Sequence, residues 1–343
     1  MAHAASDSAV ENVDLANVLV RYADLRPCTT AFIDTRTPGS AEKENITIIG
    51  PGVAENPDQH VHISVPHGFN IGGARQPPGC LNSQHSHETA EVFVVHSGTW
   101  AFLLGPNKED GEVVLGPGDV ISIPIHVFRG FKNVGEDTGF LYAVLGGDDP
   151  GHVTWAPYVF ENAEKHGLIL MEDGSLVDTT KSEQIPAGKN RMRATTEADV
   201  ASLRRITAEE MSGCAVTHAA ICNAIPSGGL PDVNEIPLIG AASEGENLDA
   251  GQMTWSHGFN LRFITIDAGV ETSSHIRQEE EVIFVHSGTL SVQLPGCEFD
   301  AGPGDTLTMP VGVPRQYSNK GDSAVEAYVV RGGDTPQAAE IAA

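Results

Sequence analysis

Two histidines and one glutamate in the first third of the chain have a spacing that suits a metal ion. They are His85, His87 and Glu91. In an extended strand, residues two apart point to the same face, so these three side chains would converge if the backbone stays extended. Two imidazoles and one carboxylate form the facial triad of non-haem iron sites, which leaves positions free for a substrate and O₂. The spacing therefore predicts a divalent metal, Fe(II) first, with Mn, Ni, Co or Zn able to use the same ligands.

A competing interpretation needs no metal. Arg129 could form a buried ion pair with Glu91, which would satisfy the carboxylate structurally. If Arg129 is instead free, a guanidinium beside an open metal position suits a substrate carboxylate or a developing oxyanion. The sequence leaves both interpretations open.

Further histidines and apolar residues are candidates for the same site. His60 and His62 would share a strand face. They could act as a general base, support the metal ligands or belong to the solvated surface. His126 stands three residues before Arg129 and would supply a fourth ligand if its loop bends inward. An apolar pocket around the metal would use side chains of matching strand parity, namely Phe93, Val95, Ile123, Phe131 and Tyr142.

An internal repeat places these residues in one of two similar halves of the chain. Residues 67–98 share a pattern with residues 257–288 at an offset of 190, and residues 118–150 match residues 304–336 at an offset of 186. The first pattern contains a His-Gly-Phe-Asn tetrapeptide, a His, a Glu and a His-Ser-Gly tripeptide. A register kept over this length predicts a duplicated domain.

The second copy lacks part of the chemistry of the first. Four histidines, His60, His62, His87 and His126, are replaced by Ala250, Gln252, Arg277 and Gly312. Because too few ligands remain there, we expect the metal in the first copy alone.

Each copy has the pattern of a β-domain. Short apolar runs such as 91–95 and 120–123 alternate with Gly- and Pro-rich turns, which favours a sandwich or barrel. A length of 343 residues suggests two domains. We therefore expect an all-β protein with a few short helices. It would consist of an N-terminal arm with a helix near 9–22, a first barrel, a helical linker and a second barrel, over residues 1–45, 46–155, 156–205 and 206–343.

Composition narrows the partners and the compartment. A formal net charge of −26 disfavours nucleic acid and anionic membranes as partners. Five cysteines without a CxxC pair fit reduced thiols in a cytoplasm, and neither a signal peptide nor an apolar run of about 18 residues is visible. Because exposed sheet edges need cover, we expect a homodimer. The remaining partner that we expect is a small-molecule substrate.

Both copies resemble the cupin superfamily. Its first motif runs Gly, five residues, His-x-His, three or four residues, Glu, six residues, Gly, and the first copy fits it from Gly79 to Gly98. Its second motif runs Gly, five residues, Pro-x-Gly, two residues, His, three residues, Asn. The first copy follows this order from Gly118 to Asn133, with Arg129 where the family has its ligand histidine.

The resemblance covers about residues 46–150 and 236–338 and implies two jelly-roll barrels, a bicupin. It carries the family's metal ligands onto His85, His87 and Glu91 alone, because Arg129 and its counterpart Arg315 replace the fourth. Gentisate- and quercetin-type dioxygenases look like this chain in being cupins, often with two barrels. The resemblance thus implies a dioxygenase acting on a small aromatic or enolic oxyacid.

Two other classes of function remain open. One is a non-redox lyase, isomerase or decarboxylase on a sugar acid or other oxyacid, with the metal as Lewis acid. The other is a metal-free bicupin that binds a small molecule without catalysis.

Overall fold

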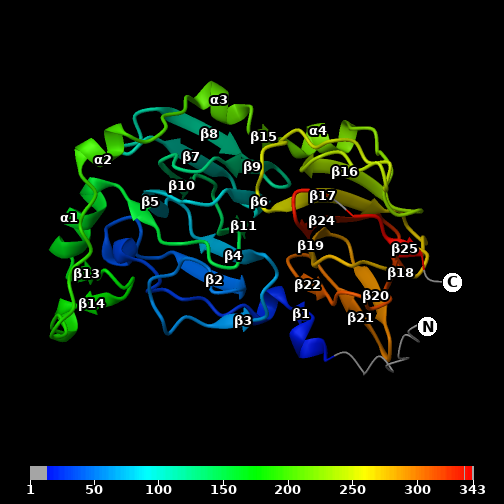
Figure 1. Ribbon diagram of the computed structural model, residues 1–343, viewed down its shortest axis with the longest axis horizontal. Coiled ribbons are helices and arrows are strands. Elements are labelled where there is room, and N and C mark those ends of the chain that lie inside the picture. Colours follow the sequence, from blue (N-terminus) through cyan, green and yellow to red (C-terminus); the bar gives the residue numbers. More distant parts are fainter. Residues whose placement is uncertain (1–13, 336, 342–343) are drawn as a thin grey trace, which may run out of the picture. The chain divides into compact units, whose positions relative to one another are not determined.

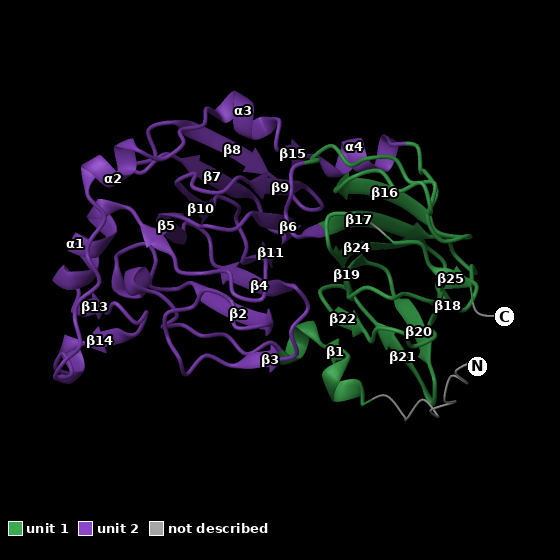
Figure 2. Cartoon of the chain, in the orientation of Figure 1, with its two compact units in different colours: residues 1–24, 225–254, 260–343 green, residues 25–224, 255–259 purple. Residues whose placement is uncertain are grey.

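The computed structural model describes residues 14–335 and 337–341 and consists mainly of β-strands (Figure 1). The chain forms two compact units (Figure 2). The first, called the N-terminal barrel below, comprises residues 25–224 and 255–259. The second, the C-terminal barrel, comprises residues 225–254, residues from 260 onward and the described residues before Leu25.

Two facing sheets build the N-terminal barrel. The larger has the strand order β15 (Ala215–Val216), β9 (Val120–Ile123), β6 (Glu91–Ser97), β11 (Gly139–Gly146), β4 (Phe69–Gln76), β2 (Glu44–Ile49) and β3 (Val61–Ile63). The smaller has the order β12 (Thr154–Trp155), β5 (Leu81–Ser86), β10 (Arg129–Asn133), β7 (Trp100–Leu104) and β8 (Gly111–Leu115). The pairings are antiparallel except β2 with β3, which is parallel.

The core of this barrel lies between the two sheets. Phe93 and Leu141 contribute to it from the larger sheet, and Phe102 and Phe131 from the smaller. The ring of Phe93 lies 5.4 Å from that of Phe102 and 5.1 Å from that of Phe131, centroid to centroid. Such aromatic pairs add about 0.5–1.5 kcal/mol each beyond the burial of apolar area. The alternation of inward apolar residues along each strand thus closes the sheets face to face.

The C-terminal barrel repeats this plan with fewer strands. Its larger sheet has the order β1 (Leu19–Val20), β22 (Thr306–Met309), β19 (Glu281–Ser287), β24 (Val325–Gly332), β17 (Phe259–Ile266) and β16 (Asn234–Ile239). The smaller sheets are β21 (Cys297–Ala301), β20 (Leu290–Leu294) and β23 (Gln316–Ser318), and the pair β18 (His275–Ile276) and β25 (Glu340–Ile341).

Strand register confirms the duplication. Glu91 is paired with Ile123 and with Leu145 in the N-terminal barrel. Glu281 is paired with Met309 and with Arg331, the positions that the two sequence offsets predict. The turns agree as well, because Gly118 and Gly304 have φ angles of 83° and 86°, which favour glycine.

The leading segment of each copy joins the sheet of the other. β1 pairs with β22, and β15 occupies the same place beside β9. A carboxylate fixes each segment: Tyr22 donates its backbone N–H to Asp305 Oδ1 over 2.8 Å, and His218 donates to Asp119 Oδ1 over 2.8 Å. Residues 206–224, which the sequence grouped with the second barrel, therefore lie in the N-terminal unit.

The prediction of a helix near residues 9–22 is wrong for the part of that segment that the structure describes. Residues 9–13 lie outside the described residues, and the rest of the segment forms a short 3₁₀ turn, Leu15–Asn17, followed by β1. Pairing with β22 supplies the backbone hydrogen bonds that a helix would have made within the segment.

Short helices and a strand pair follow the first barrel, of which the helices within residues 157–165 and 197–201 were expected and the two strands were not. They are α1 (Pro157–Lys165), β13 (Leu168–Leu170), β14 (Leu176–Asp178), α2 (Glu197–Ala201), α3 (Ala208–Ser212) and α4 (His218–Asn223). An apolar cluster joins Val159 of α1 to Phe32 and Trp155. Across the described residues, no helix is long and apolar enough to cross a membrane.

Candidate metal centre

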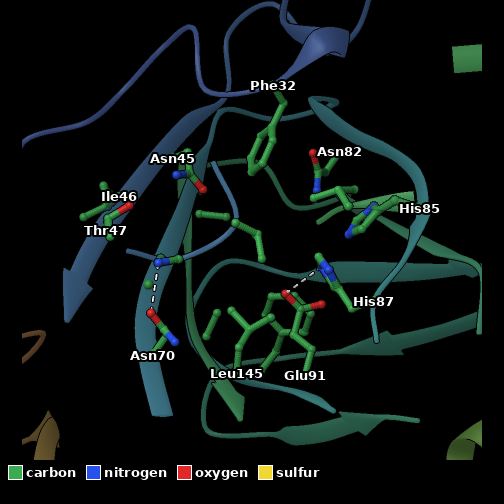
Figure 3. Close-up of a pocket in the computed structure, with 18 of the residues that line it drawn as sticks. Phe32, Asn45, Ile46, Thr47, Asn70, Asn82, His85, His87, Glu91 and Leu145 are labelled. Atoms are coloured by element: carbon green, nitrogen blue, oxygen red, sulfur yellow. Dashed lines mark hydrogen bonds and ion pairs between the residues drawn. The ribbon is translucent and has the colours of Figure 1, made fainter. Parts of the chain in front are cut away.

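The turn between β5 and β6 gathers the three predicted ligands. The donor atoms of His85, His87 and Glu91 all lie within 4.8 Å of one another, and all three side chains are buried. Figure 3 shows them along one side of a cavity. β5 ends at Ser86 and Glu91 begins β6, so the prediction that one extended strand aligns the three is wrong. The reversal of the chain over residues 87–90 produces the convergence instead.

His85 is held in one tautomer. Its Nδ1 lies 2.7 Å from the carbonyl oxygen of Ser83. A carbonyl can only accept a hydrogen bond, so Nδ1 carries the proton and the lone pair of Nε2 is available to a metal ion. The ring also packs against Trp155, with 5.4 Å between ring centroids, and β12 pairs Trp155 with His85.

Both imidazoles are neutral at physiological pH. Burial holds the pKa of His85 and that of His87 well below the ordinary value of 6.5, and the positive charge of Arg129 lowers both further. Metal ligands must be in this unprotonated form. His87 Nδ1 is buried and has no hydrogen-bond partner among the residues described.

Arg129 shares the Glu91 carboxylate with this group. The guanidinium forms an ion pair with Oε2 and donates from its other terminal nitrogen to the carbonyl of His85 over 3.2 Å. Glu91 Oε1 lies 3.7 Å from His87 Nε2. Burial raises the pKa of Glu91, which the Arg129 charge opposes. The ion pair and the ligand group thus coexist, and Arg129 is not the free substrate-binding guanidinium considered above.

The other predicted histidines lie elsewhere. His126 is exposed with a φ of 59°, and its backbone N–H donates to the carbonyl of His87 over 3.0 Å. His62 Nε2 accepts from the backbone of Arg26, and its ring contacts that of exposed His60. Neither His62 nor His126 lines the cavity. The prediction that His126 supplies a fourth ligand is therefore wrong for this conformation.

The three-residue group fits a divalent metal ion. It offers two neutral nitrogen donors, one with its tautomer fixed, and a carboxylate oxygen that the ion pair leaves available. This donor set suits Fe, Mn, Co, Ni or Zn and does not select one of them.

The cavity beside the ligands is small and mainly apolar. About 50 Å³ is open to the centres of water-sized molecules. Phe93 and Phe131 line it as predicted, whereas Val95, Ile123 and Tyr142 are buried without lining it. Further apolar lining residues, which the sequence did not reveal, are Phe32, Val53, Leu145, Val153 and Trp155.

Polar side chains also line the cavity, among them two asparagines. Asn45 and Asn82 both line the cavity. Lys43 donates to Asn82 Oδ1 over 2.7 Å, and buried Asp34 forms an ion pair with Lys43. Because the amide oxygen is committed to Lys43, the amide nitrogen of Asn82 faces the cavity (Figure 3). A comparison of the two copies could have identified Asn45 from the sequence, because its counterpart at the 190-residue offset is Glu235.

The equivalent place in the C-terminal barrel holds a network of ion pairs. Glu281 accepts from Arg315 over 3.1 Å, from Arg331 over 2.9 Å and from the Tyr317 hydroxyl over 2.8 Å. Arg277, which replaces His87, has its Nε 3.1 Å from Glu281 Oε2. Burial alone would raise the pKa of Glu281, but the arginines hold it well below its ordinary value. Only about 10 Å³ of cavity remains.

Comparisons with known proteins agree with this architecture. Residues 74–145 and 262–331 each match the cupin domain family. A 90-residue segment is 38% identical to germin-like protein subfamily 1 member 7 of Arabidopsis thaliana, and it covers 24% of this chain and 38% of that protein.

Solved structures that resemble this chain do so at low sequence identity. Oxalate decarboxylase of Bacillus subtilis at pH 4.6 matches with a TM-score of 0.53 and 13% identity, over 95% of this chain and 78% of that one. A variant of salicylate 1,2-dioxygenase from Pseudoaminobacter salicylatoxidans has a TM-score of 0.48 and 13% identity, over 78% and 72% of the two chains. The match to the decarboxylase shows a common fold and, at 13% identity, no common reaction. The repeated register and the two matched segments together show that the chain contains two cupin domains and is a bicupin.

Proposed function

We propose that the N-terminal barrel is a metal-dependent dioxygenase site that acts on a small oxyacid. His85, His87 and Glu91 would hold the metal, with Fe(II) as the first choice. A bound Fe(II) would supply binding of a substrate oxygen and activation of O₂. The C-terminal barrel would have no catalytic role, because its ion pairs occupy the corresponding carboxylate.

One observation carries this proposal. Three buried donors converge within 4.8 Å on the wall of a cavity, with both imidazoles neutral. Burying such groups without a partner is costly, so a barrel without a function for them would favour apolar or ion-paired residues. The C-terminal barrel has made that replacement, which supports a function for the group retained in the first.

Cavity size supports a small substrate. A water molecule needs roughly 10–15 Å³ of such space, so the 50 Å³ cavity admits about four water-sized groups. An enolic or 2-oxo acid of a few carbons fits this space better than a substituted benzene ring. The divalent ion, the Glu91 carboxylate and the Arg129 guanidinium together carry net positive charge, which favours an anionic substrate.

The chain's own residues would orient that substrate. Phe32 and Trp155 would help to exclude water, and the amide groups of Asn45 and Asn82, which also line the cavity, would offer polar contacts to the substrate. In a cavity of low polarity, each such hydrogen bond has a larger effect than it would in water.

The same small cavity also suits a second candidate, a non-redox lyase or decarboxylase acting on a small oxyacid. There the metal would act as a Lewis acid without O₂. Oxygen dependence separates the two reactions.

The test combines metal analysis with oxygen uptake. Wild type and His87→Arg, which copies Arg277, are purified anaerobically, supplied with Fe(II) and analysed for bound metal. We expect about one iron per chain in the wild type, from a single ligand group, and loss of that iron in the variant. Oxygen uptake is then measured with short enolic and 2-oxo acids, beside aromatic oxyacids.

A matched variant controls for surface binding. His60→Ala/His62→Ala removes two histidines outside the cavity and should keep the iron. Equal iron in wild type and His87→Arg would refute the metal site. Turnover that continues without O₂ would replace the dioxygenase by the non-redox candidate.

A further inference from the structure

Arg129 occupies the place where the cupin motif has a fourth metal ligand. It lies on β10, paired with His85 of β5 on one side and with Leu104 of β7 on the other. Its side chain is 1% exposed and therefore points into the barrel. A group at this position contacts the ligands or replaces one.

Its contacts join two of the three ligand residues. One terminal nitrogen pairs with Glu91 Oε2, and the other donates to the His85 carbonyl over 3.2 Å. A planar guanidinium held at two points has little freedom to rotate. The Glu91 carboxylate is thereby fixed with Oε2 on the arginine and Oε1 beside His87, at 3.7 Å from Nε2.

The C-terminal barrel shows the alternative arrangement of the same pair. Arg315 donates to Glu281 Oε1 over 3.1 Å, but Arg331 also donates to Oε2 over 2.9 Å. Both oxygens are thus taken. Arg277 Nε also lies 3.1 Å from Oε2. The N-terminal barrel has Leu145 in place of Arg331 and His87 in place of Arg277, so one oxygen is left for another partner.

We propose that Arg129 is a positioning residue that makes Glu91 a one-oxygen ligand and keeps a fourth protein ligand out. The metal ion would then have three protein ligands, and its remaining positions would face the cavity. This inference depends on the proposed function, because it assumes that the ligand group binds a metal ion.

Counting coordinated water tests this role without turnover. Mn²⁺ serves as the probe, because water-proton relaxation reports how many exchanging waters it holds, and titration gives its Kd. With three protein ligands on a six-coordinate ion, wild type should show about three waters. Arg129→Lys, which keeps the charge beside Glu91, should retain that number.

Two further variants should change the number. Arg129→Met releases Oε2, so Glu91 can bind through both oxygens and one water is lost. Arg129→His restores the fourth ligand of the cupin motif, so one water is lost and Kd tightens by about tenfold or more. Circular dichroism checks that each variant is folded, and Arg129→His and Arg129→Lys remain decisive if Arg129→Met is not.

The outcomes separate the two proposals. If wild type binds no Mn²⁺, the metal site and this inference both fail. If wild type binds Mn²⁺ but Arg129→His and Arg129→Met keep the wild-type water number, the metal site stands and Arg129 has no positioning role.

Discussion

The guanidinium of Arg331 donates from Nε to Glu281 Oε2 over 2.9 Å, at a position that Leu145 occupies in the first copy. A second contact, from its terminal nitrogen, reaches Glu235 Oε1 over 2.9 Å. Arg331 is one of three replacements around the Glu281 carboxylate, beside Arg277 in place of His87 and Tyr317 in place of Phe131. Together they separate a carboxylate with an available oxygen from one that is fully used.

Arg331→Leu should destabilise the C-terminal barrel strongly. The variant leaves Glu281 and Glu235 buried with less cationic charge, and breaking a buried pair from one side costs about 3–5 kcal/mol. Urea unfolding should show the lower midpoint. Lys320→Ala, which breaks an exposed pair with Glu298 in the same unit, should leave the midpoint unchanged. Adding Glu235→Asn to Arg331→Leu should recover part of the lost stability. A double variant that unfolds at a lower urea concentration than Arg331→Leu would contradict this account.

Arg277→His should not create a second metal site. It restores the histidine of the first copy, but Arg315, Arg331 and Tyr317 still occupy the Glu281 carboxylate. Titration with Mn²⁺ should give the same number of ions per chain as wild type. An additional tightly bound ion would show that the network yields to a metal and would overturn this interpretation of the C-terminal barrel.

His85→Ala should weaken metal binding, whereas His275→Ala should not. The two histidines hold equivalent positions, and each has Nδ1 near the carbonyl of the residue two before it. His85 alone has a second imidazole beside it, with 5.0 Å between its ring and that of His87. Isothermal titration should show at least about a hundredfold weaker binding for His85→Ala. Equal losses in the two variants would place the metal outside the N-terminal cavity.

Glu55 should make stability fall as pH rises. Burial raises its pKa from 4.5 to about 8, although the Trp155 indole and the Ile33 backbone both donate to it. Between these two values the folded state keeps a proton that the unfolded state has released, so this contribution to the unfolding free energy declines by about 1.4 kcal/mol per pH unit. Glu55→Gln has no proton to lose. The unfolding free energy of wild type relative to that variant should therefore decrease steadily from pH 5 to pH 7 in urea titrations. A difference that does not depend on pH would disprove the assignment.

The sequence predicts the repeat and the ligands well because both are local. The two offsets carry the partners of Glu91 onto the partners of Glu281 on the neighbouring strands, since a duplicated strand order preserves its register. His85, His87 and Glu91 lie within seven consecutive positions, so a single turn determines their meeting.

The walls of the cavity depend on contacts that the motif does not contain. Phe32 and Trp155 come from outside the strands that carry the ligands, and their rings meet 5.8 Å apart through tertiary packing. The orientation of Asn82 depends on Lys43, 39 residues earlier in the chain. Whether Arg129 would face a substrate or Glu91 was likewise a matter of side-chain geometry, which spacing alone does not determine.

The exchanged leading strands have a consequence for biosynthesis. Leu19 is synthesised 288 residues before its strand partner Leu307 (307 − 19 = 288). The N-terminal barrel can finish its larger sheet once Val216 has emerged, but the C-terminal one must recruit a segment synthesised long before it. Such distant pairing is slow to form. A nascent chain will therefore hold β1 unpaired until β22 has been made. Cutting the gene between the two repeats, before β15, would deprive each product of the edge strand that completes its sheet.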